Sequence, residues 1–150
     1  PHGCRGLVMW AGGSMGGQRE VVGANQFPWP IGKQSLFTLC LVARRRRFLV
    51  ERRVDILRVR SRMAGWIAYL AWRGMSPATR PKLVTTVHGL YSVNRYSKVM
   101  LKGERIIAVS NTIRDYILRN YPDTDANRIQ VIYRGVEEAE FPYGYQPTHD

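Results

Sequence analysis

A histidine–glycine pair ends the run of the sequence that is richest in β-branched residues. Residues 82–87, Lys-Leu-Val-Thr-Thr-Val, predict a buried strand, and His88 and Gly89 follow it directly. An imidazole can donate, accept or exchange a proton near neutral pH, and a glycine lets a ligand approach the backbone. The pair therefore predicts either a ligand-contacting histidine or a structural one that is satisfied by a carbonyl, and the residues alone leave both interpretations open.

Other short segments that follow predicted strands could also meet a ligand. Ser110 and Asn111 open a predicted helix, where free amides favour an anion, although plain helix capping explains the same residues. The glycine-rich residues 12–17 resemble a phosphate loop but fit neither the dinucleotide nor the Walker pattern, so a flexible turn is the simpler interpretation. The complete set of strand-end candidates is Gly12-Gly13, Arg60-Ser61-Arg62, His88-Gly89, Ser110-Asn111 and Arg134-Gly135.

Strands that alternate with helices must position these candidates. Such alternation forms βαβ units and predicts an α/β, Rossmann-like, doubly wound parallel sheet. In these sheets ligands bind beyond the carboxyl ends of the strands, so the five segments should line one edge. The predicted strands cover residues 6–10, 55–59, 82–87, 105–109 and 128–132, and the predicted helices cover about 35–53, 61–75 and 110–121, with a weaker helix over 15–22.

The composition limits the class of protein. The chain has 150 residues, enough for one domain with a sizeable core, and its hydrophobic share of 45% is ordinary for a soluble globular protein. No apolar run reaches the ~18 residues that a membrane span needs. Cys4 and Cys40 lie far apart without metal-ligand spacing, which favours reduced cysteines in a cytoplasmic protein. No Ser-His-Asp, Cys-His or zinc arrangement can be assembled, so neither a metal nor a cofactor is expected.

The net charge of +12 predicts an anionic partner. Nine arginines against two acids fall between residues 41 and 62, and four of them are consecutive: Arg44, Arg45, Arg46 and Arg47. Because four consecutive residues point to all sides of a helix, the run does not define one basic stripe. A solvated surface, an anionic membrane contact and nucleic-acid binding all remain open, although no reading helix or aromatic platform supports nucleic acid as the expected partner.

Several segments taken together resemble family-four glycosyltransferases of bacterial lipopolysaccharide or related cell-surface polysaccharide synthesis. Each segment alone is common, but their order and spacing match across nearly the whole chain. The segments are Asp55 to Arg62 (DILRVRSR) with Trp66, Val84 to Tyr91 (VTTVHGLY) with Ser92 to Ser97, Met100 with Gly103-Glu104-Arg105, Ile107 to Ser110 followed by Ile113-Arg114, and Val131 to Val136 (VIYRGV).

The resemblance implies a GT-B fold, in which two Rossmann-like domains face each other across a cleft. Residues 1–136 would form the N-terminal, acceptor-side domain without its first strand, and residues 137–150 would begin the interdomain linker. The C-terminal domain, which binds the nucleotide sugar, would be missing, and the start at Pro1 without a methionine suggests an incomplete N-terminus as well. We therefore expect the chain to be inactive by itself.

The resemblance also implies a reaction and roles for individual residues. A sugar would pass from a nucleotide-sugar donor to a cell-envelope glycan or glycolipid acceptor with retained configuration, in the cytoplasm or peripherally at the inner membrane. His88 would reach the donor sugar near the reacting carbon, and Arg58 stands where related sequences often have histidine. The residues expected to bind substrate are Arg60, Ser61 and Arg62 on the acceptor side, Gly89, Ser110, and Arg134 and Gly135 at the interdomain cleft.

Two alternatives belong to other classes of function. A basic nucleic-acid-binding module would explain the charge but not the strand-end His-Gly and Arg-Gly segments. A half-enzyme retained for protein interactions would explain the segments without catalysis.

Overall fold

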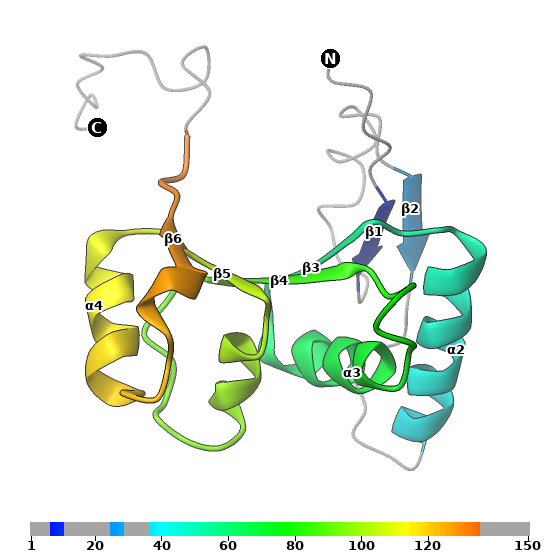
Figure 1. Cartoon of the computed structure of the whole chain (residues 1–150), viewed down its shortest axis with the longest axis horizontal. Helices are drawn as coiled ribbons and strands as arrows, with labels where there is room; N and C mark the ends of the chain where they lie inside the picture. The colour runs from blue at the N-terminus through cyan, green and yellow to red at the C-terminus, as the bar shows by residue number, and fades with distance from the viewer. Residues whose placement is uncertain (1–6, 11–24, 29–36, 136–150) are drawn as a thin grey trace, which may run out of the picture.

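The computed structural model describes residues 7–10, 25–28 and 37–135, and it contains two parallel sheets (Figure 1). The smaller sheet pairs β1 (Leu7–Trp10) with β2 (Asn25–Pro28). The larger sheet has the order β3-β4-β5-β6. Its strands are β3 (Ile56–Val59), β4 (Lys82–Val87), β5 (Arg105–Ala108) and β6 (Ile129–Val131).

The connections of the larger sheet lie on one of its faces. The strands follow each other in sequence order, and right-handed crossovers then place every connecting helix on the same side. Figure 1 shows α3, the turn between β4 and β5, and α4 below the sheet. The helical elements are α2 (Phe37–Glu51), α3 (Arg62–Arg73) and α4 (Asn111–Asn120), with the 3-10 turns η1 (Ser97–Leu101) and η2 (Ala126–Arg128).

The core fills the space between the sheet and these helices. Leu83, Thr85 and Val87 alternate along β4, and each has at most 2% of its surface exposed. One cluster of apolar residues joins β4, β5 and β6 to α4 and η1, and a second joins β3 and β4 to α2 and α3. Packing of both clusters against the helices fixes the positions of the strand ends. The parallel pairing of the four strands confirms the predicted α/β, Rossmann-like sheet.

The turn at Gly103 connects η1 to β5 and packs closely against β4. The hydroxyl of Thr85 donates to the carbonyl of Met100 at 2.6 Å, and the Glu104 amide donates to the Leu83 carbonyl at 2.7 Å. Arg128 donates to the carbonyls of Leu101, at 2.9 Å, and Gly103. The turn is therefore surrounded by backbone on several sides.

The expected bounds agree with most of the described elements. β4 has the predicted ends, and β3, β5 and β6 lie within the predicted strands. β2 and the two 3-10 turns were not predicted. The predicted helix over residues 15–22, the Gly12-Gly13 turn and the expected linker at 137–150 lie outside the described residues.

Candidate functional site

The carboxyl ends of β3 to β6 meet at one edge of the sheet, as expected for parallel strands. The ladder continues just past the strands, because the Val109 amide donates to the Val87 carbonyl at 3.3 Å and the Ile132 amide donates to the Ala108 carbonyl at 2.9 Å. We call the segments that follow these strands the carboxyl edge. They comprise residues 60–62, 88–96, 109–110 and 132–135.

His88 is exposed at this edge and lies beside Tyr91. The two rings meet edge to face, with centroids 5.8 Å apart. The Tyr91 hydroxyl is 3.4 Å from Nδ1 and 3.5 Å from Nε2 of His88, so it favours neither nitrogen. These are long contacts for hydrogen bonds. The tyrosine therefore limits the position of the imidazole and leaves a ring nitrogen available to a ligand.

Arg62 is held between two aromatic rings and a hydroxyl. Its guanidinium carbon lies 5.1 Å from the ring centroid of Tyr91 and 5.4 Å from that of Tyr96. Its Nη1 donates to the Ser97 hydroxyl at 3.3 Å. Cation–π contacts of this kind contribute about 0.5–2 kcal/mol, more when the cation is partly buried. Arg62 is half-buried, and these contacts restrict the positions that its guanidinium can take.

Hydrogen bonds from both flanking helices fix the loop over residues 88–97. Trp66 of α3 donates from Nε1 to the Tyr96 carbonyl at 3.0 Å. Tyr116 of α4 donates from its hydroxyl to the Tyr91 carbonyl. Because the two helices hold opposite parts of the loop, the His88–Tyr91 pair has a defined position relative to the strand ends.

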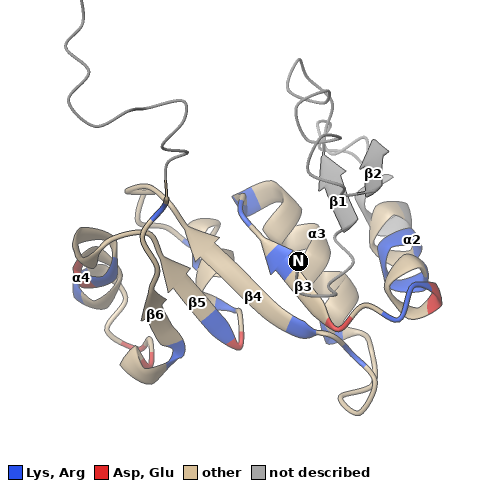
Figure 2. Cartoon of the chain, turned by 90° about the horizontal axis from the view of Figure 1, so that it is seen from above, with Lys and Arg blue, Asp and Glu red and all other residues tan. Residues whose placement is uncertain are grey.

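The carboxyl edge carries positive charge only. Within residues 37–135 its segments contain arginines at positions 60, 62, 95 and 134, and no Asp or Glu. Figure 2 shows Lys and Arg on α2 and α3 as well, with few acidic residues in the described part. The acids near the sheet instead precede strands at the opposite edge: Asp55, Glu104, Asp123 and Asp125. The opposite edge also carries basic residues, among them Lys82, Arg105 and Arg128, whereas the described carboxyl edge has basic residues without acids and is therefore suited to anions.

Burial and nearby charges act in opposite directions on the pKa of the Tyr91 phenol. Burial raises the pKa of Tyr91 above its ordinary value, while a backbone hydrogen bond of His88 and the charges of Arg62, Arg60 and Arg134 act in the opposite direction. A tyrosine is neutral near pH 7 even at its ordinary pKa, and an upward shift of the pKa keeps the Tyr91 hydroxyl available as a hydrogen-bond donor.

Ser110 caps α4, as one of the two sequence interpretations expected. Its hydroxyl accepts from the Ile113 amide at 3.3 Å. The next residue, Asn111, donates from Nδ2 to the Tyr133 hydroxyl at 2.9 Å and so ties the start of α4 to the segment that precedes Arg134. The Ser110 hydroxyl is therefore engaged by its own helix.

The remaining strand-end residues differ in their surroundings. Ser61 is the N-cap of α3 but makes no side-chain cap hydrogen bond. A Cβ added to Gly89 or Gly135 would meet nothing within 4 Å, so the backbone there is open to a ligand. Arg58 donates from Nε to the Thr86 hydroxyl at 3.1 Å and so reaches across to β4.

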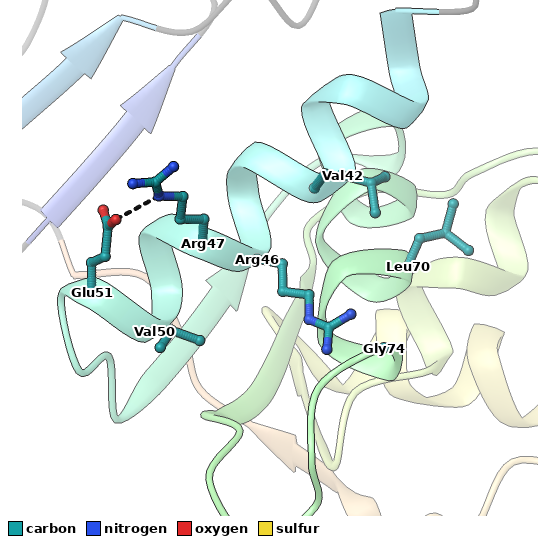
Figure 3. A pocket seen from close by; sticks show the side chains of 8 residues that line it. Val42, Arg46, Arg47, Val50, Glu51, Leu70 and Gly74 are labelled. Carbon is teal, nitrogen blue, oxygen red and sulfur yellow. Dashed lines mark hydrogen bonds and ion pairs between the residues drawn. The ribbon is translucent and has the colours of Figure 1, made fainter.

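The arginine run of α2 lies away from the carboxyl edge, beside a groove of about 560 Å³ between α2 and α3 (Figure 3). Arg44, Arg46 and Arg47 are exposed, and Arg47 pairs with Glu51 at 2.7 Å. Arg45 has only 5% of its surface exposed, and burial lowers its pKa. The groove is lined by Val42, Ala43, Arg46, Arg47, Val50, Glu51, Leu70 and Gly74.

Sequence reasoning did not select the three tyrosines that organise the site, Tyr91, Tyr96 and Tyr116. Tyr91 and Tyr96 lie in the segments that carry the family resemblance, and the spacing of three residues between His88 and Tyr91 was the available signal. In the part of the chain that the structure describes, no group of three His, Cys, Asp or Glu could hold a metal ion. The described helices are also too short or too polar to cross a bilayer.

The parallel sheet and the helices that flank it define an α/β protein of the Rossmann-like class. The sequence profile of Glycosyltransferase Family 4 matches residues 5–140, and the chain belongs to this family. Among solved structures it is similar to a glycosyltransferase from Rickettsia africae ESF-5, with a TM-score of 0.77 and 28% identity. That match covers 97% of this chain and 39% of the Rickettsia protein. No curated protein matches the chain.

Proposed function

We propose that the chain supplies the acceptor-side half of a glycosyltransferase. In this proposal a sugar passes from a nucleotide-sugar donor to a glycan or glycolipid acceptor of the cell envelope, with retained configuration. The proposal is based on the carboxyl edge, which has an exposed His88 and an Arg62 held between two aromatic rings. The described segments of this edge contain no Asp or Glu. Membership of family 4 and the likeness to the Rickettsia glycosyltransferase support sugar transfer in general.

The proposed chemistry depends on positioning and charge stabilisation. The acceptor hydroxyl oxygen bonds to the anomeric carbon, the bond from that carbon to the donor phosphate breaks, and the hydroxyl proton passes to the departing phosphate oxygen. In this proposal the departing phosphate itself takes the proton of the acceptor hydroxyl. His88 would donate a hydrogen bond to the donor sugar beside the reacting carbon, where a fixed donor stabilises the transition state.

The donor nucleotide would be held mainly by a second Rossmann-like domain that faces the carboxyl edge. Since the chain spans 39% of the similar Rickettsia protein, we expect the 150 residues by themselves to show no turnover. A direct test uses the complete product of the gene that encodes this chain, with labelled nucleotide sugars and bacterial envelope lipids as acceptors. Transfer that retains the anomeric configuration supports the proposal. Absence of transfer from every common nucleotide sugar, or an inverted product, would count against it.

We also propose that the exposed arginines of α2 contact an anionic bilayer at the inner membrane. Arg46 lines the groove with the apolar side chains of Val50 and Leu70, which have 58% and 40% of their surfaces exposed, and Arg44 is exposed elsewhere on the same helix. Figure 3 shows Val42, Val50 and Leu70 around the groove, with Arg46 extending toward Gly74. Basic and apolar groups on one surface are typical of helices that lie in a membrane interface.

Binding to vesicles tests this contact. Each arginine near an anionic surface contributes about 1 kcal/mol, so replacing Arg44 and Arg46 by Gln should weaken binding to phosphatidylglycerol-containing vesicles roughly thirtyfold. The matched control replaces Arg114 and Arg119 of α4, which removes the same charge at the opposite end of the sheet (Figure 1). Cosedimentation in low and high salt measures the effect. Equal binding to neutral and anionic vesicles, or an equal loss of vesicle binding in both double variants, would show that the α2 arginines only form a solvated surface.

A further inference from the structure

Tyr91 connects the exposed imidazole of His88 to the interior of the protein. A Cβ at Gly89, the next residue, would meet nothing within 4 Å, so the loop backbone beside the imidazole is uncovered. Tyr91 is half-buried and packs against the apolar cluster that joins β4, β5 and β6 to α4 and η1. Among the described residues, the hydrogen-bonding and ring contacts of the His88 imidazole are all with Tyr91. The position of the imidazole therefore depends on the position of this tyrosine.

Tyr91 is itself fixed by partners on both flanking helices. The Tyr116 hydroxyl of α4 donates to the Tyr91 carbonyl. The guanidinium of Arg62, the first residue of α3, lies 5.1 Å from the centroid of the Tyr91 ring. That guanidinium is held in turn by the ring of Tyr96 and the hydroxyl of Ser97. Because both its backbone and its ring have partners, Tyr91 gives the neighbouring imidazole a fixed point of contact.

The Tyr91 hydroxyl lies almost equally far from the two ring nitrogens of His88, 3.4 Å from Nδ1 and 3.5 Å from Nε2. Contacts of this length are weak, but catalytic hydrogen bonds are often long in a free enzyme and shorten in the complex with substrate. A small rotation of the imidazole would shorten one contact to a hydrogen bond and turn the other nitrogen away from the tyrosine. In a neutral imidazole the nitrogen that accepts carries no proton, so the proton is then on the other nitrogen.

We propose that Tyr91 is a positioning residue for sugar transfer: its hydroxyl donates to one nitrogen of the His88 imidazole and so directs the N–H of the other nitrogen toward the donor sugar. This role rests on the proposed function, in which His88 donates a hydrogen bond beside the reacting carbon. Tyr91 does not touch the sugar itself. It holds the imidazole in the tautomer and orientation in which that N–H is available, and a donor that is already oriented needs no reorganisation in the transition state.

NMR of the 150-residue chain tests the contact without any need for turnover. Tyr91→Phe keeps the ring and removes only the hydroxyl, and Tyr69→Phe makes the same change in a half-buried tyrosine of α3. The chain has three histidines, so isotopic labelling of the histidine nitrogens gives few signals, and His88→Ala identifies those of His88. At alkaline pH an ordinary histidine is neutral, and its two nitrogen shifts report which nitrogen carries the proton. Tyr91→Phe should move both His88 shifts toward those of free histidine, and Tyr69→Phe should leave them unchanged.

Kinetics of the complete gene product test the consequence for the reaction. Loss of one neutral hydrogen bond to the imidazole should lower turnover roughly tenfold in Tyr91→Phe, with little change in KM. Tyr91→Leu also removes the ring contact and should lose more turnover. Because Tyr91 acts through the imidazole, adding Tyr91→Phe to His88→Ala should cause no further loss, whereas residues that act independently give additive losses. Tyr69→Phe should keep the turnover of the unaltered protein.

Two results would overturn this role of Tyr91 even where the complete gene product transfers sugar. One is a set of His88 nitrogen shifts that Tyr91→Phe leaves unchanged. The other is an additive loss of turnover in the double variant, because a tyrosine that only stabilises the fold would lower turnover equally in the His88→Ala background. If the His88 shifts respond to Tyr91→Phe while the complete gene product transfers no sugar, the contact between the two side chains stands and the glycosyltransferase proposal fails.

Discussion

Replacement of His88 by alanine should lower the turnover of the complete gene product by about a hundredfold or more, with little change in melting temperature. A hydrogen-bond donor aimed at the transition state from a preorganised site is worth about 2.7–4 kcal/mol when it is removed. The imidazole is exposed, and its contacts with the Tyr91 hydroxyl are 3.4 and 3.5 Å long, so the fold depends little on it. Removal of such a surface side chain changes stability by about 0.5 kcal/mol.

Steady-state kinetics and thermal unfolding of the same preparations check this result. Ser92→Ala provides the matched control, because Ser92 is exposed in the same loop four residues further on. His88→Asn, which keeps a side-chain donor, should recover part of the lost turnover. Near-normal turnover of His88→Ala, or its unfolding, would show that His88 is not the residue that contacts the reacting sugar.

Replacement of Gly103 by alanine should produce the largest loss of stability among the described glycines. A Cβ at this position would lie 2.6 Å from the Arg105 carbonyl oxygen and 3.0 Å from the Thr85 amide nitrogen. Both are backbone atoms, one in β5 and one in β4, so relief requires the backbone of the turn to rearrange. Overpacking of this kind costs about 1–3 kcal/mol, which corresponds to roughly 2–12 °C in melting temperature for a chain of this size.

Gly89→Ala is the matched control for Gly103→Ala. A Cβ at Gly89 meets nothing within 4 Å, so the same chemical change should leave the stability almost unchanged. Urea unfolding followed by circular dichroism gives the free energy of unfolding of both variants. Equal stabilities for the two variants would mean that the Gly103 turn can relax, and that its packing against β4 contributes little.

The sequence by itself determined the features that depend on neighbouring residues. The β-branched run at 82–87 predicts β4 with both of its ends, and Ser110 predicts the cap that its hydroxyl makes with Ile113. The alternation of strands with helices predicts the parallel sheet, and with it the shared edge that holds His88 and Arg134. These predictions succeed because strand propensity, capping and crossover geometry are local properties.

Other features depend on partners that are distant in the sequence. β2, with the sequence Asn-Gln-Phe-Pro, has no strong strand pattern, and it is a strand because it pairs with β1. Arg45 is buried although both of its neighbours are exposed arginines, since burial depends on which side of α2 meets the rest of the molecule. Four identical residues in a row cannot show which of them points toward the rest of the molecule.

The arrangement around Arg62 was likewise decided only by the tertiary structure. Arg62 begins α3, whereas Tyr91 and Tyr96 lie about thirty residues away in the loop after β4. Trp66 and Tyr116 bring that loop to the helix through hydrogen bonds to its carbonyls. The sequence contains all of these residues but not the distances between them, because those distances arise when α3 and α4 pack on the same face of the sheet and bury their apolar sides.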